Sequence, residues 1–241
     1  MGWLSDFGSS IASAFSSVCE TVGKIGTAVS NFAHAAKPVL GPILQTIEKY
    51  VPHPAVKAVA SFANTLLQAL SIFRPDETVQ DMGDRALQAS EKGITQDKFE
   101  NFDEYMGALR DFDVNPEASA KFSLIDKFIA GLGVATSGIE DKFKVAPGSL
   151  NDMWILPLTN PGYFSPDRIK SMLENGKEIG DVSAYLGERM DGVEAKDFRK
   201  NYEFTPDGKP MNDTELGKLY EALDSARGEW ASLEKQIKDS N

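Results

Sequence analysis

The chain has 241 residues, of which 41% are hydrophobic and 25% charged, so it is long enough to bury a core in one large domain or two small ones. Its formal net charge of −11 argues against nucleic-acid binding through a basic face, and its single cysteine, Cys19, excludes an internal disulfide framework. Residues 1–73 are nearly neutral, with four lysines and three acidic residues, whereas residues 74–241 are strongly acidic. This asymmetry predicts two regions with different tasks, divided near residue 74.

Residues 3–32 carry an apolar stripe with hardly any charge opposite it. Apolar side chains recur every three or four residues, which predicts one long amphipathic helix. The other face holds serine, threonine and glycine, where a surface helix of a soluble protein normally carries charged residues. Such a helix binds lipid by burying bulky side chains rather than by attracting headgroups. The stripe consists of Trp3, Leu4, Phe7, Ile11, Phe15, Val18, Val22, Ile25, Val29 and Phe32.

Two further helices are expected in the first region, a short one at 43–50 and a longer one at 55–73. The longer helix again has one apolar side and a single charge, Lys57, on the other. We therefore predict that residues 1–73 form a helical region directed at a membrane or an assembly. The alternative is that the same stripes pack against each other and the acidic body as ordinary core. The second stripe comprises Val56, Val59, Leu66, Leu70 and Phe73.

The acidic region is predicted to be a multi-helix bundle, because each apolar segment has recognisable end signals. We expect a helix at 76–92 that stops at Gly93, and another after Thr95. Asn115-Pro116-Glu117 predicts a helix start, with Phe122, Ile125, Ile129 and Leu132 facing inward. The glycines at 131, 133 and 138 then predict a flexible joint.

An irregular, proline-rich segment is expected at 145–164, and its residues 153–156 fit either a short extended segment or a buried plug. Helices at 166–175 and 182–190 and a turn at 205–208 should follow. The last helix should begin near Asn212, with Glu215 placed for a capping box.

The terminal helix has apolar residues in three heptads, a pattern that favours packing against a partner helix. Docking on its own domain is the alternative interpretation. The partner-helix seam consists of Leu216, Leu219, Leu223, Trp230, Leu233 and Ile237.

Patterns that carry chemistry are mostly missing. His34 and His53 have no neighbour at metal-ligand spacing, and no nucleophile and base pattern is visible. The stretch from Asp111 departs from a calcium loop at Pro116 and Phe122, and residues 131–138 lack the lysine of a phosphate loop. We therefore expect no catalytic, cofactor-binding or metal-binding residues. Acidic residues at 100–113 and 181–194 leave a carboxylate hydrolase as an alternative.

An apolar, serine-, alanine- and glycine-rich start on an acidic helical body resembles, in composition, minor virion proteins that breach membranes and secreted toxins that insert helices. The leading hypothesis is a non-enzymatic, virion-associated or similar assembly protein. Its expected partners are a lipid membrane, protein subunits or both, and we expect it to be a homo-oligomer or part of a larger assembly. A secreted pore-forming effector that inserts the helices at 3–32 and 55–73 as a hairpin is the runner-up. The first cation is Lys24, so no Sec signal peptide is expected, which leaves membrane association, virion association or secretion by another route.

Overall fold

The structure is a computed structural model that describes residues 53–240, apart from the side chains of 53–59, 125, 151, 158 and 232–240. It contains ten α-helices and two short 3-10 helices in this range, which confirms the predicted mostly α-helical class. The helices expected at 3–32 and 43–50 lie outside the described residues. The elements are α3 (His53–Ala69), α4 (Val79–Glu91), η1 (Gln96–Lys98), α5 (Phe102–Arg110), α6 (Pro116–Ser119), α7 (Leu124–Phe143), η2 (Asn151–Trp154), α8 (Ile155–Thr159), α9 (Pro166–Glu174), α10 (Val182–Leu186), α11 (Gly192–Lys200) and α12 (Asp213–Ser240).

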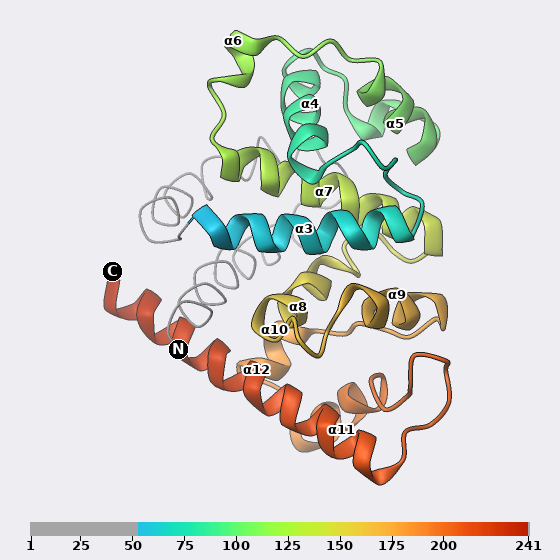
Figure 1. Cartoon of the computed structure of the whole chain (residues 1–241), viewed down its shortest axis with the longest axis vertical. Helices are drawn as coiled ribbons and strands as arrows, with labels where there is room; N and C mark the ends of the chain where they lie inside the picture. Colours follow the sequence, from blue (N-terminus) through green and yellow to red (C-terminus); the bar gives the residue numbers. More distant parts are fainter. Residues whose placement is uncertain (1–52, 241) are drawn as a thin grey trace.

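Helix α3 crosses the middle of the molecule. Figure 1 shows α4 to α7 on one side of it and α8 to α12 on the other. It contacts α4 and α7 in the first group and α9 in the second. The larger of two buried hydrophobic clusters includes residues from Ala60 to Trp230, so side chains on both sides of residue 74 belong to it.

The predicted helix ends agree with the observed caps where local hydrogen bonding decides them. Helices α4 and α9 are each followed by a glycine with positive φ, Gly93 and Gly176. The backbone N–H of Glu215 donates to Asn212 Oδ1 at 3.0 Å, and that of Asn212 donates to Glu215 Oε2 at 2.9 Å, which confirms the capping box before α12.

Several boundaries differ from the sequence-based expectation. Helix α4 begins at Val79 rather than at 76, and Thr95 precedes only the three-residue η1, whereas Asn101 caps α5. Asn115 does cap a helix, but α6 has only four residues, and a new helix begins after Ser123. Ser123 and Asp126 form a reciprocal capping box, which provides a second helix start that the sequence analysis overlooked. The helix expected at 182–190 ends at Leu186, and α11 follows with its own capping box between Asp191 and Glu194.

The flexible joint expected at residues 131–138 is wrong, because these glycines lie inside α7. A Cβ atom added at Gly131 would lie 1.8 Å from the carbonyl oxygen of Val79, and one at Gly83 would lie 1.7 Å from that of Lys127. The two glycines therefore bring the backbones of α4 and α7 into direct contact. Their absent side chains serve close packing rather than flexibility.

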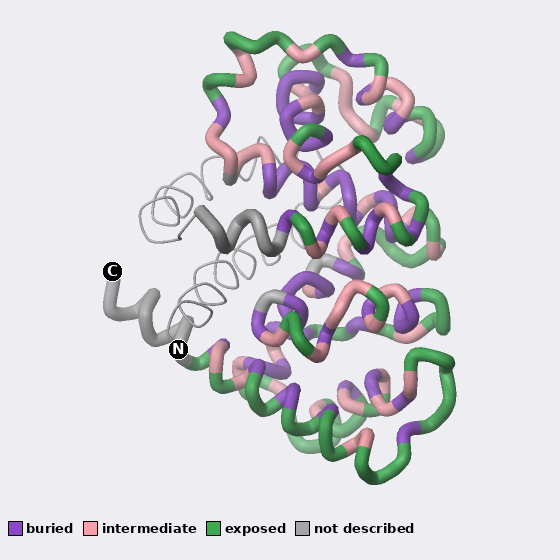
Figure 2. Tube along the Cα trace, viewed as in Figure 1, coloured by how far each residue is buried: buried purple, intermediate pink, exposed green. Residues whose placement is uncertain are grey.

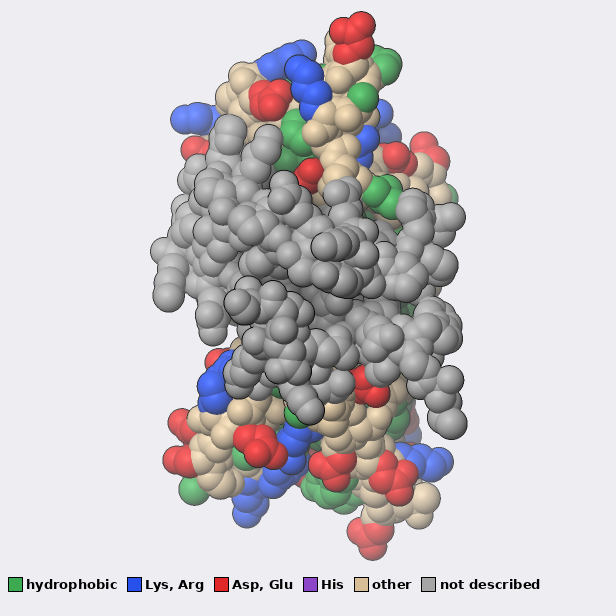
Figure 3. All heavy atoms as spheres, turned by 90° about the vertical axis from the view of Figure 1, so that its left-hand side faces the viewer, with side chains coloured by type: hydrophobic (Ala, Val, Ile, Leu, Met, Phe, Trp, Pro, Cys, Tyr) green, Lys and Arg blue, Asp and Glu red, His purple; other side chains and the backbone are tan. Residues whose placement is uncertain are grey.

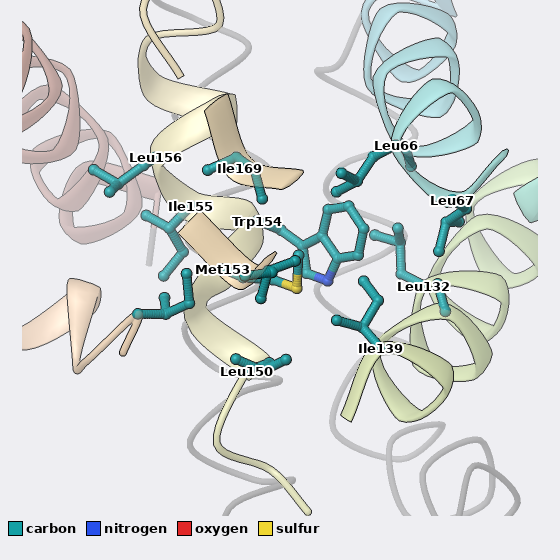
Figure 4. Packing of buried hydrophobic residues seen from close by; sticks show 14 of the residues in the cluster. Leu66, Leu67, Leu132, Ile139, Leu150, Met153, Trp154, Ile155, Leu156 and Ile169 are labelled. Atoms are coloured by element: carbon teal, nitrogen blue, oxygen red, sulfur yellow. The ribbon is translucent and has the colours of Figure 1, made fainter. Parts of the chain in front are cut away.

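The proline-rich segment contains a buried helical plug formed by η2 and α8. Trp154 is only 2% exposed, and its indole Nε1 donates to Thr136 Oγ1 at 2.9 Å. Figure 4 shows the indole between Leu66 of α3 and Ile139 of α7. Of the two interpretations for residues 153–156, the buried plug agrees with the structure and the extended segment does not.

Candidate functional site

The described part of the second predicted stripe lies in the interior. Leu66, Leu70 and Phe73 are buried with exposed fractions of 0%, 2% and 4%. Figure 2 shows the buried positions along the C-terminal half of α3. These three side chains pack in the hydrophobic core of the chain, at the end of α3 and just after it, and α3 contacts α7 and α9. The side chains of Val56 and Val59, at the start of α3, lie outside the description.

Polar contacts hold the end of α3 against the segment that follows it. Asn64 Oδ1 accepts from the backbone N–H of Val79 at 2.8 Å and so satisfies a free donor in the first turn of α4. Gln68 Nε2 donates to the carbonyl oxygens of Pro75 at 3.3 Å and Glu77 at 3.4 Å. Neither side chain was singled out by its sequence pattern, since each acts on a residue outside its own helix.

A half-buried ion pair joins this same segment to α5. Arg110 Nε donates to Glu77 Oε1 at 2.6 Å, and Arg110 Nη2 donates to Glu77 Oε2 at 3.0 Å and to the Ile72 carbonyl oxygen at 3.3 Å. Burial alone would raise the pKa of Glu77, but the hydrogen bonds from Arg110 and from the Arg74 backbone, with the charge of Arg110, lower it overall. We call α3 together with these contacts the α3 anchor, because they hold α3 and the segment after it to α4 and α5.

The described part of the α12 seam is buried within the chain. Leu219, Leu223 and Trp230 lie in the core, Leu216 is partly buried, and α12 contacts α8 and α10. This agrees with docking of the helix on its own domain. The side chains of Leu233 and Ile237 lie outside the description, so a partner helix at the end of α12 stays a prediction.

The acidic residues considered for a hydrolase are exposed, and four of the nine contribute to helix caps. Asp181 accepts from the backbone N–H of Ala184 at 2.7 Å at the start of α10. Asp191 and Glu194 form the capping box of α11, and Glu104 accepts from Asn101 at the start of α5. The remaining members, Glu100, Asp103, Asp111, Asp113 and Glu188, are exposed.

Two buried carboxylates were not found by sequence analysis. Asp84 accepts hydrogen bonds from Gln88 and Ser119 and lies 3.0 Å from Lys127 Nζ, and the contacts with these side chains lower its pKa against the effect of burial. Glu140 accepts from the backbone N–H of Leu150 at 3.1 Å, and burial raises its pKa. Asp84 connects α4 with α6 and α7, and Glu140 holds the loop before η2, so both have structural roles in this geometry.

Over the described range, no group of three or more His, Cys, Asp or Glu side chains is placed to hold a metal ion. His53 is the first residue of α3, and His34 lies outside the description. None of the helices between residues 53 and 240 is both long and apolar enough to cross a bilayer.

The described surface is mostly polar. Its exposed large hydrophobic residues are Val145, Val193 and Tyr220, which lie far apart in the sequence. Figure 3 shows acidic and basic side chains at both ends of the face on which α3 begins and α12 ends. No protein family model matches the chain, and no curated protein or solved structure is significantly similar to it.

Proposed function

We propose that this protein is a non-enzymatic assembly protein whose residues 1–52 bind a lipid membrane while the α3 anchor attaches them to the folded acidic body. One observation carries the proposal: ten bulky apolar residues recur along 3–32 with an almost uncharged face opposite them. This combination favours adsorption to lipid by apolar burial.

The stripe provides enough apolar surface for such binding. Burial of one large side chain contributes roughly 1.5–3 kcal/mol, so six of them give on the order of 10 kcal/mol before ordering costs are subtracted. Trp3 suits the headgroup boundary, where tryptophan is enriched.

The α3 anchor supports a role in which membrane contact is transmitted to the body. Leu66 and Leu70 lie in the shared core, and Glu77 joins the following segment to α5 through Arg110. Residues 1–52 are therefore followed directly by a helix that is built into the core. A pore-forming hairpin that included α3 would have to remove these leucines from the core and break the contacts of α3 with α7 and α9. This requirement favours the assembly protein over the pore-forming effector.

The test is flotation of the full chain with small phosphatidylcholine vesicles. We expect the chain to float with the vesicles and the variant Phe7→Ser/Ile11→Ser/Phe15→Ser to stay in the dense fraction. The variant Ser9→Gln/Ser13→Gln/Ser16→Gln, which changes the same number of residues on the polar face, is the control and should float like the unchanged chain.

Dye release and sedimentation separate the alternatives in the same samples. An assembly protein should bind without rapid release of an entrapped dye, whereas a pore-forming effector should release the dye at a low protein-to-lipid ratio. In another outcome, the chain fails to bind vesicles but self-associates through Phe7, Ile11 and Phe15. The partner of the stripe would then be neighbouring subunits rather than a membrane. A chain that does neither would contradict the proposal.

A further inference from the structure

Charge is segregated along the chain at the start of α3. Residues 1–52 contain three lysines and three acidic residues, so the formal charge of −11 lies on residues 53–241. Within the apolar stripe, Lys24 is the only cation. The segment proposed to bind lipid therefore gains almost nothing from anionic headgroups, since such attraction comes from clustered lysine and arginine.

The negative charge of the body is on its surface and is poorly compensated around α5. The stretch from η1 to α6 has seven exposed acidic residues. Its two basic residues are already paired, Lys98 with Asp97 and Arg110 with Glu77. The acidic residues are Asp97, Glu100, Asp103, Glu104, Asp111, Asp113 and Glu117.

The α3 anchor limits how far this body can move from the stripe. Only residues 33–52 separate them, 20 residues in all. Even a fully flexible chain of that length has a root-mean-square reach of only about 25 Å. The screening length is about 8 Å at physiological salt but about 30 Å at 0.01 M. At low salt the body therefore feels the potential of any charged surface to which the stripe is bound.

From these observations we infer that the partner is a loosely packed bilayer of low net charge, and that the acidic body disfavours anionic bilayers. The inference rests on the proposed function and specifies its lipid. Loose packing matters because the stripe binds by inserting Trp3, Phe7 and Phe15, which need gaps between headgroups. The salt dependence should be the reverse of that of a basic peripheral protein: added salt should strengthen binding to anionic vesicles.

The experiment is flotation of the full chain with sonicated vesicles of dioleoylphosphatidylcholine, alone or with one lipid in three replaced by dioleoylphosphatidylglycerol. At about 0.01 M salt we expect binding to the anionic vesicles to be about tenfold weaker, and at about 0.15 M the difference should fall below about threefold. Large saturated phosphatidylcholine vesicles, whose headgroups are tightly packed, should bind less than the small unsaturated ones at both salt concentrations.

A charge variant tests whether the body causes the difference. Glu100→Gln/Asp111→Asn/Asp113→Asn removes three exposed charges whose side chains make no hydrogen bond to another described residue. At low salt, this variant should bind anionic vesicles about two- to threefold more strongly than the unchanged chain, because its body carries less negative charge. Its binding to neutral vesicles should be the same as that of the unchanged chain.

The outcomes distinguish the two proposals. In one outcome, binding depends on Phe7, Ile11 and Phe15 and yet, at low salt, is as strong on anionic vesicles as on neutral ones, or stronger. That result would overturn this inference and leave the proposed function standing. Equal binding to tightly and loosely packed neutral vesicles would overturn the part of the inference that concerns lipid packing. No binding to any vesicle would overturn both.

Discussion

Helices α7 and α12 are the two longest of the described helices, and they pack differently. Helix α7 is surrounded by other elements. Besides large side chains such as Phe128, it packs through the missing side chain of Gly131 and through buried polar groups such as Glu140. Helix α12 lies at the edge of the molecule and packs through one row of large side chains, among them Leu223 and Trp230 (Figures 1 and 2). The apolar spacing along an edge helix indicates which of its sides is packed, because only one side is buried. A helix that is surrounded by other elements has no such single apolar side.

The largest effect is expected from a single methyl group in the contact of α7 with α4. Gly131→Ala places a Cβ 1.8 Å from the Val79 carbonyl oxygen, so the two backbones must separate. We expect a loss of about 4 kcal/mol or more in the free energy of unfolding, measured by urea denaturation followed by tryptophan fluorescence. Gly107→Ala, where an added Cβ meets nothing within 4 Å, is the matched control on α5. Equal stability of the two variants would show that α4 and α7 are not in backbone contact.

Shortening a large side chain on α12 should have a smaller, though still substantial, effect. Leu223 is buried against the body, so Leu223→Ala should cost about 3 kcal/mol through lost burial and the cavity left behind. Glu221→Ala on the exposed face of the same helix should change stability by less than about 0.5 kcal/mol. A loss below about 1 kcal/mol for Leu223→Ala would indicate that the seam is not packed on the body.

Glu140 of α7 should make part of the stability of the fold depend on pH. Its pKa in the folded chain is raised above 4.5, so the ionised carboxylate opposes folding at neutral pH, and this penalty decreases as the pH falls toward 4.5. Glu140→Gln removes the titration. The unchanged chain should therefore gain stability relative to this variant as the pH is lowered from 7 toward 4.5.

The comparison of Glu140→Gln with the unchanged chain isolates this group from Glu77 and Asp84. The pKa values of those two carboxylates are lowered, so their contributions are present at higher pH and are lost on acidification in both proteins. Denaturation midpoints at several pH values are the measurement. A constant difference between the two proteins over this pH range would contradict a raised pKa at Glu140.

The smallest effect is expected on the exposed face of α12. An added Cβ at Gly217 or Gly228 meets nothing within 4 Å, and both positions are helical. Gly217→Ala should therefore raise the stability by up to about 1 kcal/mol, because alanine loses less backbone entropy than glycine on entering a helix. A destabilised variant would show that this face of α12 is covered.

By itself, the sequence determined the caps of helices such as α9 and α12 and which side of α12 is apolar. Those features depend on contacts a few residues apart, such as Asn212 with Glu215, or on a repeated pattern along one helix. The same local reasoning placed a flexible joint at Gly131, because a glycine inside a helix and a glycine in a loop look alike until a neighbouring backbone is known.

Only the tertiary structure decided what the apolar side of α3 contacts and which carboxylates are buried. By its spacing, Leu66 fits a lipid-facing stripe and a core-facing stripe equally well. It belongs to the core because α7 and α9 pack against α3. Asp84 and Glu140 resemble the other acidic residues in the sequence, and their burial comes from elements distant in the chain. Apolar spacing specifies which side of a helix is buried, whereas the identity of the surface that buries it depends on long-range contacts.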